Sequence, residues 1–286
     1  MIDPNRPRAC VTGWPVSHSR SPLIHGYWLS RYEIDGSYER IATPPGEFSR
    51  FAARIGVDGL RGANVTAPLK LAAFAACDRH TDVALAMGAV NTLWREGAAL
   101  WGDNTDVEGF LGNLDEEAPD WRREVRSAVI LGAGGASRAV VYALLSAGVE
   151  RIVITNRTVE RAEALVKAFG PKLLISEWAE ASSWLGDADM LVNTTSLGMS
   201  GQDQLDIDLS RLRPGAFVAD VVYVPLETSL LEDARKRGLR TVGGLGMLLH
   251  QAAPGFARWF GLRPSVTPGL RSLVEADIVG ANGKSA

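Results

Sequence analysis

The chain has 286 residues, of which 46% are hydrophobic and 22% charged, and 30 Lys and Arg against 33 Asp and Glu give a net charge of -3. This composition is that of a folded globular protein, and it excludes a disordered or fibrous chain. The slightly negative charge, with no run of Lys or Arg, argues against nucleic acid as a partner. At about 150 residues per domain, the length predicts two domains.

The sequence indicates neither membrane insertion nor secretion. No apolar run approaches the roughly 20 residues that span a bilayer, and residues 1–7 lack the apolar core of a signal peptide. We therefore expect a cytoplasmic protein with no membrane partner. Cys10 and Cys77 lie far apart, and neither they nor the four histidines have a metal-ligand spacing. A disulfide scaffold and a metal site are therefore not expected.

Short β-type runs alternate with helical periodicity over the first hundred residues. Strands are expected at 8–13, 38–41, 60–65, 89–94 and 98–101. A helix is expected from about Pro22, a residue that suits a first helical turn, and the spacing of Phe48, Phe51 and Ile55 predicts another. Strands that alternate with helices predict a mainly parallel sheet in an α/β fold.

A second series of strands is expected after residue 126. Apolar runs typical of strands buried on both faces of a sheet lie at 127–131, 151–155, 189–193 and 216–221. The segment 114–120 is acidic and contains Pro119, so it is expected to be a surface connection between the two regions.

A glycine-rich turn follows the first strand of this second series. It comprises Gly132, Ala133, Gly134, Gly135 and Ala136, and it lies between the strand ending at Leu131 and a predicted helix at 140–147. In that context, glycines let a pyrophosphate approach the backbone N–H groups at a helix N-terminus. The third glycine of the usual fingerprint is replaced by the small residue Ser137. A simple strand–turn–helix junction is the alternative interpretation.

The end of the next strand indicates which dinucleotide would bind. An NAD site places an acid there to bind the ribose hydroxyls. This chain instead has Asn156, Arg157, Thr158 and, one turn later, Arg161. Two guanidinium groups and a hydroxyl attract a 2′-phosphate, which predicts NADP as the cofactor. In the alternative, the two arginines are solvated charges beside Glu160 and Glu163.

Polar clusters outside this region lie near expected strand ends, at residues 17–22, 64–70, 91–92, 102–106 and 250–251. Ligands of α/β sheets bind at the carboxyl ends of strands, so these clusters can converge. Single residues also have capping interpretations, as for Ser21 before Pro22. Lys70 and Asp106 are compatible with a proton-transfer pair and with an ordinary surface ion pair.

Nine motifs, in order, resemble those of the shikimate dehydrogenase family. They are GWPVSHSRSPLIH (13–25), NVTAPLK (64–70), GAVNTL (88–93), GDNTDVEGF (102–110), GAGGASRA (132–139), NRT (156–158), NTTSLGM (193–199), DVVY (220–223) and GGLGMLLHQA (243–252). The resemblance extends from Gly13 to about Gly261. Small departures occur at Gly26, Ala67 and Leu69, and none of them removes a chemical group that the family's mechanism needs.

The resemblance implies a Rossmann dinucleotide-binding domain, 107–244, and a discontinuous α/β substrate-binding domain, formed by 1–106 with C-terminal helices in 245–286. The implied activity is the NADPH-dependent, reversible reduction of 3-dehydroshikimate to shikimate in the biosynthesis of chorismate and aromatic amino acids. No metal is implied, and a monomer or homodimer is expected.

The resemblance also implies the site residues. Lys70 and Asp106 match the catalytic acid–base pair. Ser19, Ser21 and Tyr223 match the residues that hold the substrate carboxylate, and Asn64, Thr66, Asn91 and Gln251 match those that contact ring hydroxyls. The expected cofactor contacts are Gly132, Ala133, Gly134, Gly135, Ala136, Asn156, Arg157, Thr158, Arg161, Val221 and Gly244.

Two alternatives compete with this function. One is a quinate/shikimate dehydrogenase that uses NAD, or an aminoshikimate relative; Arg157 and Thr158 favour NADP instead. The other is a non-catalytic, nucleotide-sensing regulatory module. Such a module has no need of Lys70 and Asp106, and the presence of both argues for an enzyme.

Overall fold

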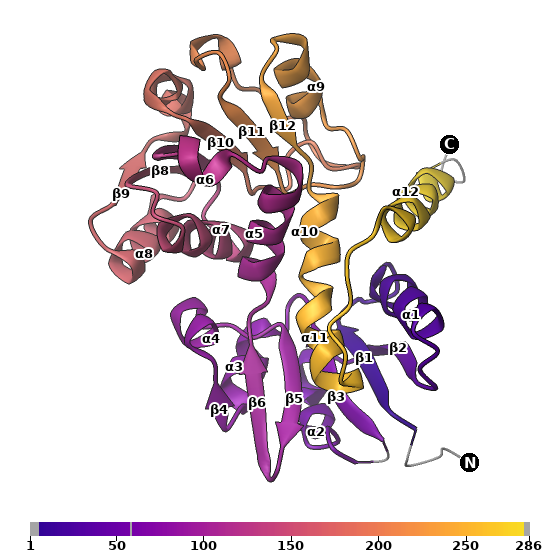
Figure 1. The fold of residues 1–286 in the computed structure, drawn as a ribbon. Helices are drawn as coiled ribbons and strands as arrows, with labels where there is room; N and C mark the ends of the chain where they lie inside the picture. The colour runs from indigo at the N-terminus through magenta and orange to yellow at the C-terminus, as the bar shows by residue number, and fades with distance from the viewer. Residues whose placement is uncertain (1–5, 58, 283–286) are drawn as a thin grey trace. The chain divides into compact units, whose positions relative to one another are not determined.

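The computed structural model describes residues 6–57 and 59–282 (Figure 1). Contacts within the chain form two compact units, each described here by itself. Unit 1 comprises Met1–Asp106 and Leu249–Asp277, and unit 2 comprises Val107–Leu248 and Ile278–Ala286. The expectation about a signal peptide concerns mainly residues 1–5, which lie outside the described part.

Unit 1 is built on a six-stranded sheet in the order β2-β1-β3-β5-β6-β4. The strands are β1 (Arg8–Gly13), β2 (Ser37–Ala42), β3 (Leu60–Val65), β4 (Arg79–His80), β5 (Thr92–Glu96) and β6 (Ala99–Asp103). β1 pairs in parallel with β2 and β3, as predicted, whereas β5 is antiparallel to both β3 and β6. Only residues 97 and 98 separate β5 from β6, with Gly97 at φ 58, and so short a turn joins antiparallel strands.

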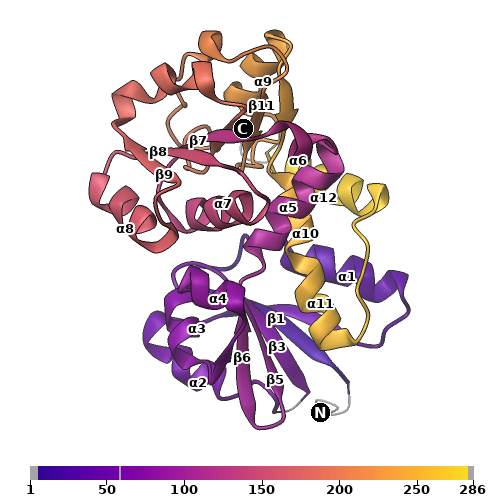
Figure 2. The ribbon, with the colours of Figure 1, turned by 60° about the vertical axis from the view of Figure 1, so that its left-hand side comes forward.

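The helices of unit 1 include α11 and the start of α12, which come from the C-terminal part of the chain. They are α1 (Ser21–Arg31), η1 (Pro45–Glu47), α2 (Phe48–Ala52), α3 (Lys70–Ala76), α4 (Asp82–Met87), α11 (Ala252–Phe260) and the start of α12 (Pro268–Asn282). α11 lies against β3 and β5 (Figure 2), where Trp259 Nε1 donates to the Leu93 carbonyl at 2.9 Å. Gly62 permits this approach, because a Cβ there would lie 2.0 Å from Trp259 Nε1.

Unit 2 is built on a six-stranded sheet in the order β12-β11-β10-β7-β8-β9, and all of its pairs are parallel. The strands are β7 (Ser127–Leu131), β8 (Arg151–Thr155), β9 (Leu173–Ser176), β10 (Met190–Asn193), β11 (Phe217–Asp220) and β12 (Arg240–Val242). Counted within the unit, this order is that of the doubly wound Rossmann fold. The predicted α/β fold class is therefore confirmed.

The helices of unit 2 correct one prediction about the chain. They are α5 (Asp106–Glu117), α6 (Trp121–Glu124), α7 (Gly135–Ser146), α8 (Val159–Phe169), η2 (Trp178–Asp187), η3 (Leu209–Arg211), α9 (Ser229–Lys236) and α10 (Leu245–His250). The segment 114–120 is not an irregular surface connection, because α5 continues to Glu117 and Leu114 is completely buried. Pro119 comes after the end of α5, where it does not interrupt the helix.

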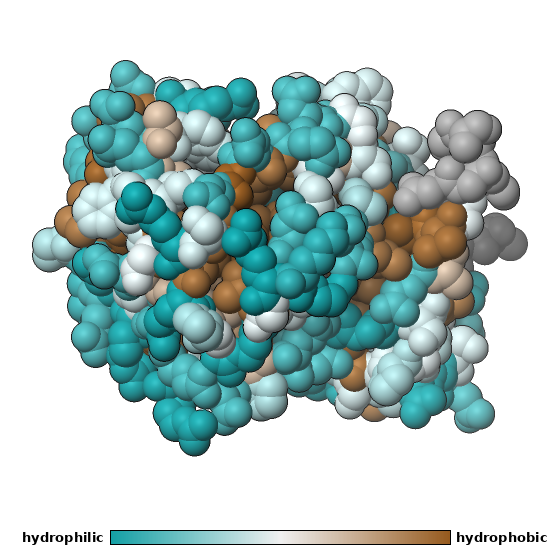
Figure 3. All heavy atoms as spheres, turned by 90° about the horizontal axis from the view of Figure 1, so that it is seen from above, coloured by the Kyte–Doolittle hydropathy of each residue, from teal (hydrophilic) through white to brown (hydrophobic). Residues whose placement is uncertain are grey.

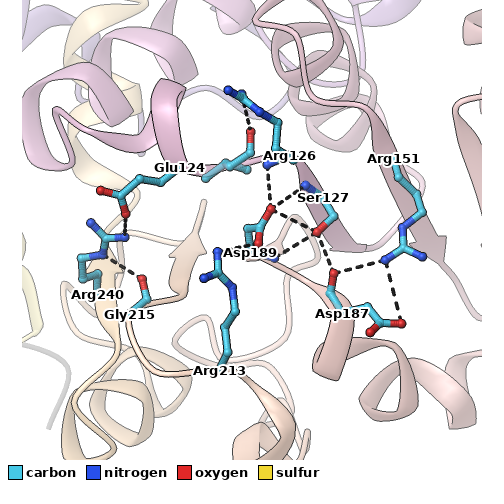
Figure 4. Close-up of polar contacts among 10 residues, drawn as sticks. Glu124, Arg126, Ser127, Arg151, Asp187, Asp189, Arg213, Gly215 and Arg240 are labelled. Atoms are coloured by element: carbon cyan, nitrogen blue, oxygen red, sulfur yellow. Dashed lines mark hydrogen bonds and ion pairs between the residues drawn. The ribbon is translucent and has the colours of Figure 1, made fainter.

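The amino-terminal edge of the unit 2 sheet carries charged side chains (Figure 4). The Asp189 carboxylate accepts hydrogen bonds from the backbone N–H groups of Arg126 at 2.7 Å and Ser127 at 2.9 Å. It also pairs with Arg213 at 2.5 Å. Asp189 therefore ties the start of β10 to the start of β7.

One face of the molecule and the helices of the described residues bear on membrane insertion. Hydrophilic residues cover most of the face in Figure 3, and hydrophobic residues appear there in smaller patches. In the described part of the chain, no helix is long and apolar enough to cross a membrane. Nor do three His, Cys, Asp or Glu side chains of this part gather where they could hold a metal ion.

Candidate active site

Lys70 and Asp106 form an ion pair in unit 1. Lys70 is the first residue of α3 and Asp106 the first residue of α5, and 36 positions separate them in the sequence. Lys70 Nζ lies 2.6 Å from Asp106 Oδ2, and the side chains are 33% and 15% exposed. Because the carboxylate is largely shielded from water, this pair differs from the solvent-exposed pairs that contribute little.

Asn91 fixes the second oxygen of the same carboxylate. The backbone N–H of Thr105 donates to Asn91 Oδ1 at 2.8 Å, and the Thr92 hydroxyl does so at 2.9 Å. Since a backbone N–H only donates, the amide oxygen must face Thr105, and the amide nitrogen is left to face Asp106. Asn91 Nδ2 donates to Asp106 Oδ1 at 2.9 Å. Both carboxylate oxygens of Asp106 therefore have fixed partners.

Asn64 joins this network from the end of β3. Its Nδ2 donates to the backbone carbonyl of Asn91 at 3.3 Å and to Thr92 Oγ1 at 3.2 Å. Its Oδ1 accepts from the Tyr38 hydroxyl at 2.7 Å. Asn64 and Asn91 are only 5% and 3% exposed. The structure thus connects four of the expected site residues, Asn64, Lys70, Asn91 and Asp106, through hydrogen bonds.

Ser19 and Ser21 lie side by side at the start of α1. Their hydroxyl oxygens are 3.2 Å apart, and the Ser21 backbone N–H donates to Ser19 Oγ at 3.3 Å. Arg40 donates twice to the Ser19 carbonyl, at 2.6 and 2.9 Å, and so holds the loop. The capping interpretation of Ser21 is wrong, because Arg20 occupies the N-cap position. Two adjacent hydroxyls suit the two oxygens of a carboxylate.

The remaining expected substrate contacts lie on other segments. Thr66 follows β3 and approaches β1 closely, because a Cβ on Gly13 would lie 2.4 Å from Thr66 Cγ2. Gln251 stands between α10 and α11 in unit 1. Tyr223 follows β11 in unit 2. The contact of these three side chains with a substrate stays a prediction.

The glycine turn of unit 2 has the backbone geometry that a pyrophosphate needs. Gly132 has φ 104, and a Cβ there would lie 2.9 Å from Thr194 Oγ1, so a side chain does not fit. A Cβ on Gly134 or Gly135 would meet nothing within 4 Å. The backbone at the start of α7 is therefore open to a ligand, which supports the dinucleotide interpretation over a simple junction. Ala133 and Ala136 belong to the same turn.

Ser137 strengthens this turn. Its buried hydroxyl donates to the Gly132 carbonyl at 2.6 Å. The residue that departs from the usual glycine fingerprint thus adds a hydrogen bond across the turn.

The polar end of β8 is exposed. Asn156 Nδ2 donates to the Thr158 carbonyl at 2.8 Å, and Thr158 precedes α8 without a capping bond from its side chain. Arg157 and Arg161 are exposed, and no carboxylate among the described residues pairs with either of them. Two guanidinium groups that no acid neutralises suit the 2′-phosphate of NADP.

Val221 and Gly244 lie next to each other after β11 and β12. A Cβ on Gly244 would lie 2.3 Å from the Val221 carbonyl oxygen, so only glycine permits this approach. The structure thus brings these two expected cofactor residues together.

Asp220, which the sequence assigned no role, organises this same edge. Its carboxylate accepts from Asn193 Nδ2 at 3.0 Å, the Val222 backbone N–H at 3.0 Å and Thr228 Oγ1 at 2.7 Å. Burial raises the pKa of Asp220 to about 6, against the lowering effect of these hydrogen bonds. Asp220 thereby fixes the start of the segment that carries Val221 and Tyr223.

Three further residues of the unit 1 network had no predicted role. Thr92 and Thr105 belong to the polar clusters 91–92 and 102–106, which were expected near strand ends, but no individual role was expected for either of them. Both are almost completely buried. Tyr38 lies outside every motif, and its contact with Asn64 crosses from β2 to β3, so no local pattern indicates it.

Comparison with known proteins matches most of the chain to one family. Residues 11–93 match the model of the shikimate dehydrogenase substrate binding domain, residues 117–200 that of shikimate / quinate 5-dehydrogenase, and residues 244–273 that of the shikimate 5'-dehydrogenase C-terminal domain. The chain is 55% identical over 271 residues to the shikimate dehydrogenase (NADP(+)) of Azorhizobium caulinodans, which covers 95% of this chain and 96% of that protein.

Solved structures are similar over nearly the full length. Shikimate 5-dehydrogenase from Thermus thermophilus, in complex with NADP(H) and shikimate, has a TM-score of 0.82 and 36% identity, with 96% of this chain and 99% of that chain covered. Quinate dehydrogenase from Corynebacterium glutamicum, in complex with NAD, has a TM-score of 0.87 and 30% identity, with 95% and 99% covered.

Proposed function

Because this chain belongs to the shikimate dehydrogenase family, we propose that it catalyses the reversible, NADPH-dependent reduction of 3-dehydroshikimate to shikimate. The observation that carries the proposal is the Lys70–Asp106 ion pair at 2.6 Å, whose carboxylate is held by a buried Asn91. A positioned cation beside a fixed carboxylate is the arrangement that reduction of a ketone needs from the protein.

Lys70 and Asp106 carry the proton chemistry in this proposal. Bound NADPH supplies the hydride that reduces the ring ketone. Lys70 Nζ gives a proton to the ketone oxygen as that oxygen gains negative charge, and the ammonium charge stabilises the oxygen until the proton has moved. Asp106 holds Lys70 in place and orients the new hydroxyl. In the oxidative direction the roles reverse, and Lys70 acts as the base that takes the proton of the shikimate hydroxyl.

The other polar groups of the site account for recognition of the substrate. Ser19, Ser21 and Tyr223 would bind the carboxylate, and Asn64, Thr66, Asn91 and Gln251 would contact ring hydroxyls. A site built to hydrogen-bond several hydroxyls rejects analogues that lack them, because its own buried polar groups are then left without partners. The near-complete burial of Asn64 and Asn91 supports such selectivity.

The residues of unit 2 fit NADP. The open backbone at Gly134 and Gly135 would hold the pyrophosphate, and Arg157, Thr158 and Arg161 would hold the 2′-phosphate. Val221 and Gly244, which lie in contact after two neighbouring strands, would complete the nicotinamide end.

A second candidate function is oxidation of quinate with NAD, favoured by the similarity to the Corynebacterium glutamicum enzyme. The exposed Arg157 and Arg161 oppose it, because NAD carries no 2′-phosphate for them to bind. An assay that follows the absorbance of the reduced cofactor distinguishes the two candidate functions. Shikimate and quinate are each tested with NADP and with NAD. We expect the highest kcat/KM for shikimate with NADP. A preference for quinate with NAD would support the second candidate. No turnover with any pair of substrate and cofactor would support the non-catalytic, nucleotide-sensing module instead.

The proposal extends to the state of the protein in the cell. A cytoplasmic location and a monomeric or homodimeric state are part of the proposal, and cell fractionation and light scattering test them.

A further inference from the structure

We propose that Tyr38 is a positioning residue, whose hydroxyl fixes the Asn64 amide as a hydrogen-bond acceptor for a ring hydroxyl of the substrate. This inference rests on the proposed function, since Asn64 is one of its substrate contacts. Tyr38 itself belongs to none of the motifs that carry the family resemblance.

The register of the sheet brings Tyr38 to Asn64 across an intervening strand. β1 lies between β2 and β3, and it pairs Ala9 with Tyr38 on one side and Val11 with Asn64 on the other. Tyr38 packs against the cluster of Ala9, Trp94 and Trp259, of which Ala9, its register partner in β1, has a small side chain. The Tyr38 hydroxyl ends 2.7 Å from Asn64 Oδ1.

The ring of Tyr38 is held on its face by His25. The two rings are stacked, with centroids 3.9 Å apart and an interplanar angle of 5°. His25 is completely buried, and burial lowers its pKa to about 3, so the stacked ring is neutral at physiological pH. Trp259 packs near the same tyrosine, with ring centroids 5.9 Å apart. The hydroxyl is therefore carried by a ring that has little freedom to turn away.

The direction of the hydrogen bond follows from the partners of Asn64. The backbone carbonyl of Asn91 can only accept a hydrogen bond, so the Asn64 side-chain atom that faces it must be the amide nitrogen. The amide oxygen then faces Tyr38, which has to donate. Burial raises the pKa of Tyr38 well above its ordinary value, against the lowering effect of a hydrogen bond with Ser21, so the hydroxyl keeps its proton.

These partners leave Asn64 one way to bind a ligand. Its amide nitrogen has two hydrogens, and these are directed at the Asn91 carbonyl and Thr92 Oγ1. Its oxygen has two lone pairs, of which Tyr38 uses one. The remaining lone pair accepts a hydrogen bond but cannot donate one. Asn64 therefore selects a substrate group that donates, as a hydroxyl does.

Tyr38→Phe tests this role, because it removes the hydroxyl and keeps the ring that stacks on His25. We expect KM for shikimate to rise about 3- to 10-fold, which is the range for loss of one hydrogen bond, with kcat and KM for NADP changed by less than about 2-fold. Tyr27→Phe is the matched control. Its hydroxyl lies 3.1 Å from Thr267 Oγ1, outside the network, so its KM for shikimate should stay at the wild-type value.

A second arm uses the Asn64→Ala background. If Tyr38 acts through Asn64, Tyr38→Phe should raise KM for shikimate by less than about 1.5-fold in that background. The inference is overturned by an unchanged KM in the single variant, by an equal rise in KM for NADP, or by an undiminished effect without Asn64. In each background, the ratio of KM with Tyr38→Phe to KM without it is compared. This comparison is valid even if Tyr38→Phe lowers Tm, provided that all the proteins are folded at the assay temperature. A wild-type protein that does not turn over shikimate would refute the proposed function instead.

Discussion

Units 1 and 2 hold the groups that we propose to bind ligands in different ways. In unit 1, Asn64, Asn91 and Asp106 are largely buried and hydrogen-bonded to one another or to shared neighbours. In unit 2, Arg157 and Arg161 are exposed, and the glycine turn presents backbone groups rather than side chains.

The difference matches the chemistry of the two ligands. A ring with several hydroxyls needs hydrogen-bond partners with fixed directions, which a buried network supplies. A phosphate spreads its charge over several oxygens, so exposed guanidinium groups can bind it through charge-assisted hydrogen bonds without a buried network around them. Substitutions within unit 1 should therefore have coupled effects, and substitutions in unit 2 should act more independently.

The largest expected effect comes from the Lys70–Asp106 pair. Lys70→Ala should lower kcat by about 10²- to 10⁴-fold, the usual contribution of a positioned acid or base, with a much smaller change in KM for shikimate. Asp106→Ala should cause a similar fall, and the double variant should be far from additive. Steady-state kinetics with the exposed Lys172→Ala as control provides the measurement. Near wild-type kcat in a folded Lys70→Ala protein would refute the mechanism.

The next largest effect concerns Arg157 in unit 2, where we expect a substitution to act on cofactor binding alone. Arg157→Ala should weaken NADP binding by about 10- to 150-fold, the effect of losing a charge-assisted hydrogen bond, and leave NAD affinity nearly unchanged. Fluorescence titration with both dinucleotides measures the two Kd values. Lys167→Ala, which removes a cation from the last turn of α8, the helix that follows Arg157 and Thr158, is the control. Equal loss of both cofactors would mean that Arg157 has a structural role.

A smaller effect concerns Asp220 at the carboxyl edge of the unit 2 sheet. Its pKa is raised to about 6 in the folded protein, chiefly by burial, so its contribution to stability is full below pH 4 and is lost as pH rises through 6. Relative to Asp220→Asn, the wild type should lose on the order of 2 kcal/mol of unfolding free energy between pH 4 and pH 7. Urea unfolding at several pH values tests this, and a constant difference would contradict it.

The smallest effect concerns Asp189 at the opposite edge of that sheet. Burial tends to raise its pKa, but hydrogen bonds from Arg126 and Ser127 and the charge of Arg213 lower it overall. Its contribution is therefore present at neutral pH and lost as pH falls through the lowered pKa. Asp189→Ala should reduce the unfolding free energy by about 1 kcal/mol at pH 7 and by less at acid pH. Urea unfolding should show a trend opposite to that of Asp220→Asn.

The features that could be predicted from the sequence are those that depend on residues close together along the chain. The strand before Gly132, the glycine turn and the basic end of β8 follow local patterns, and the structure contains all three. The strand-end clusters made convergence of Lys70 with Asp106 possible, and the family resemblance singled the pair out, because the two residues are 36 positions apart and share no local pattern.

Other features depend on geometry that the sequence does not display. The antiparallel pairing of β5 with β6 follows from a two-residue turn at Gly97, whereas an alternation of strands and helices predicts parallel pairing. The acidic composition of 114–120 suggested a connection, but Leu114 packs into the core and draws α5 through that segment. Tyr38 reaches Asn64 across β1, and only the strand register determines that contact.

The hydrogen bond between Ser137 and Gly132 also has a thermodynamic consequence. It closes the glycine turn from within the protein, with no ligand atom taking part. The conformational entropy of the turn is thus lost during folding rather than at the encounter with a dinucleotide. Binding at this turn should therefore carry a smaller entropic penalty than binding to a flexible glycine loop, and the affinity that the phosphate contacts provide should be retained in full.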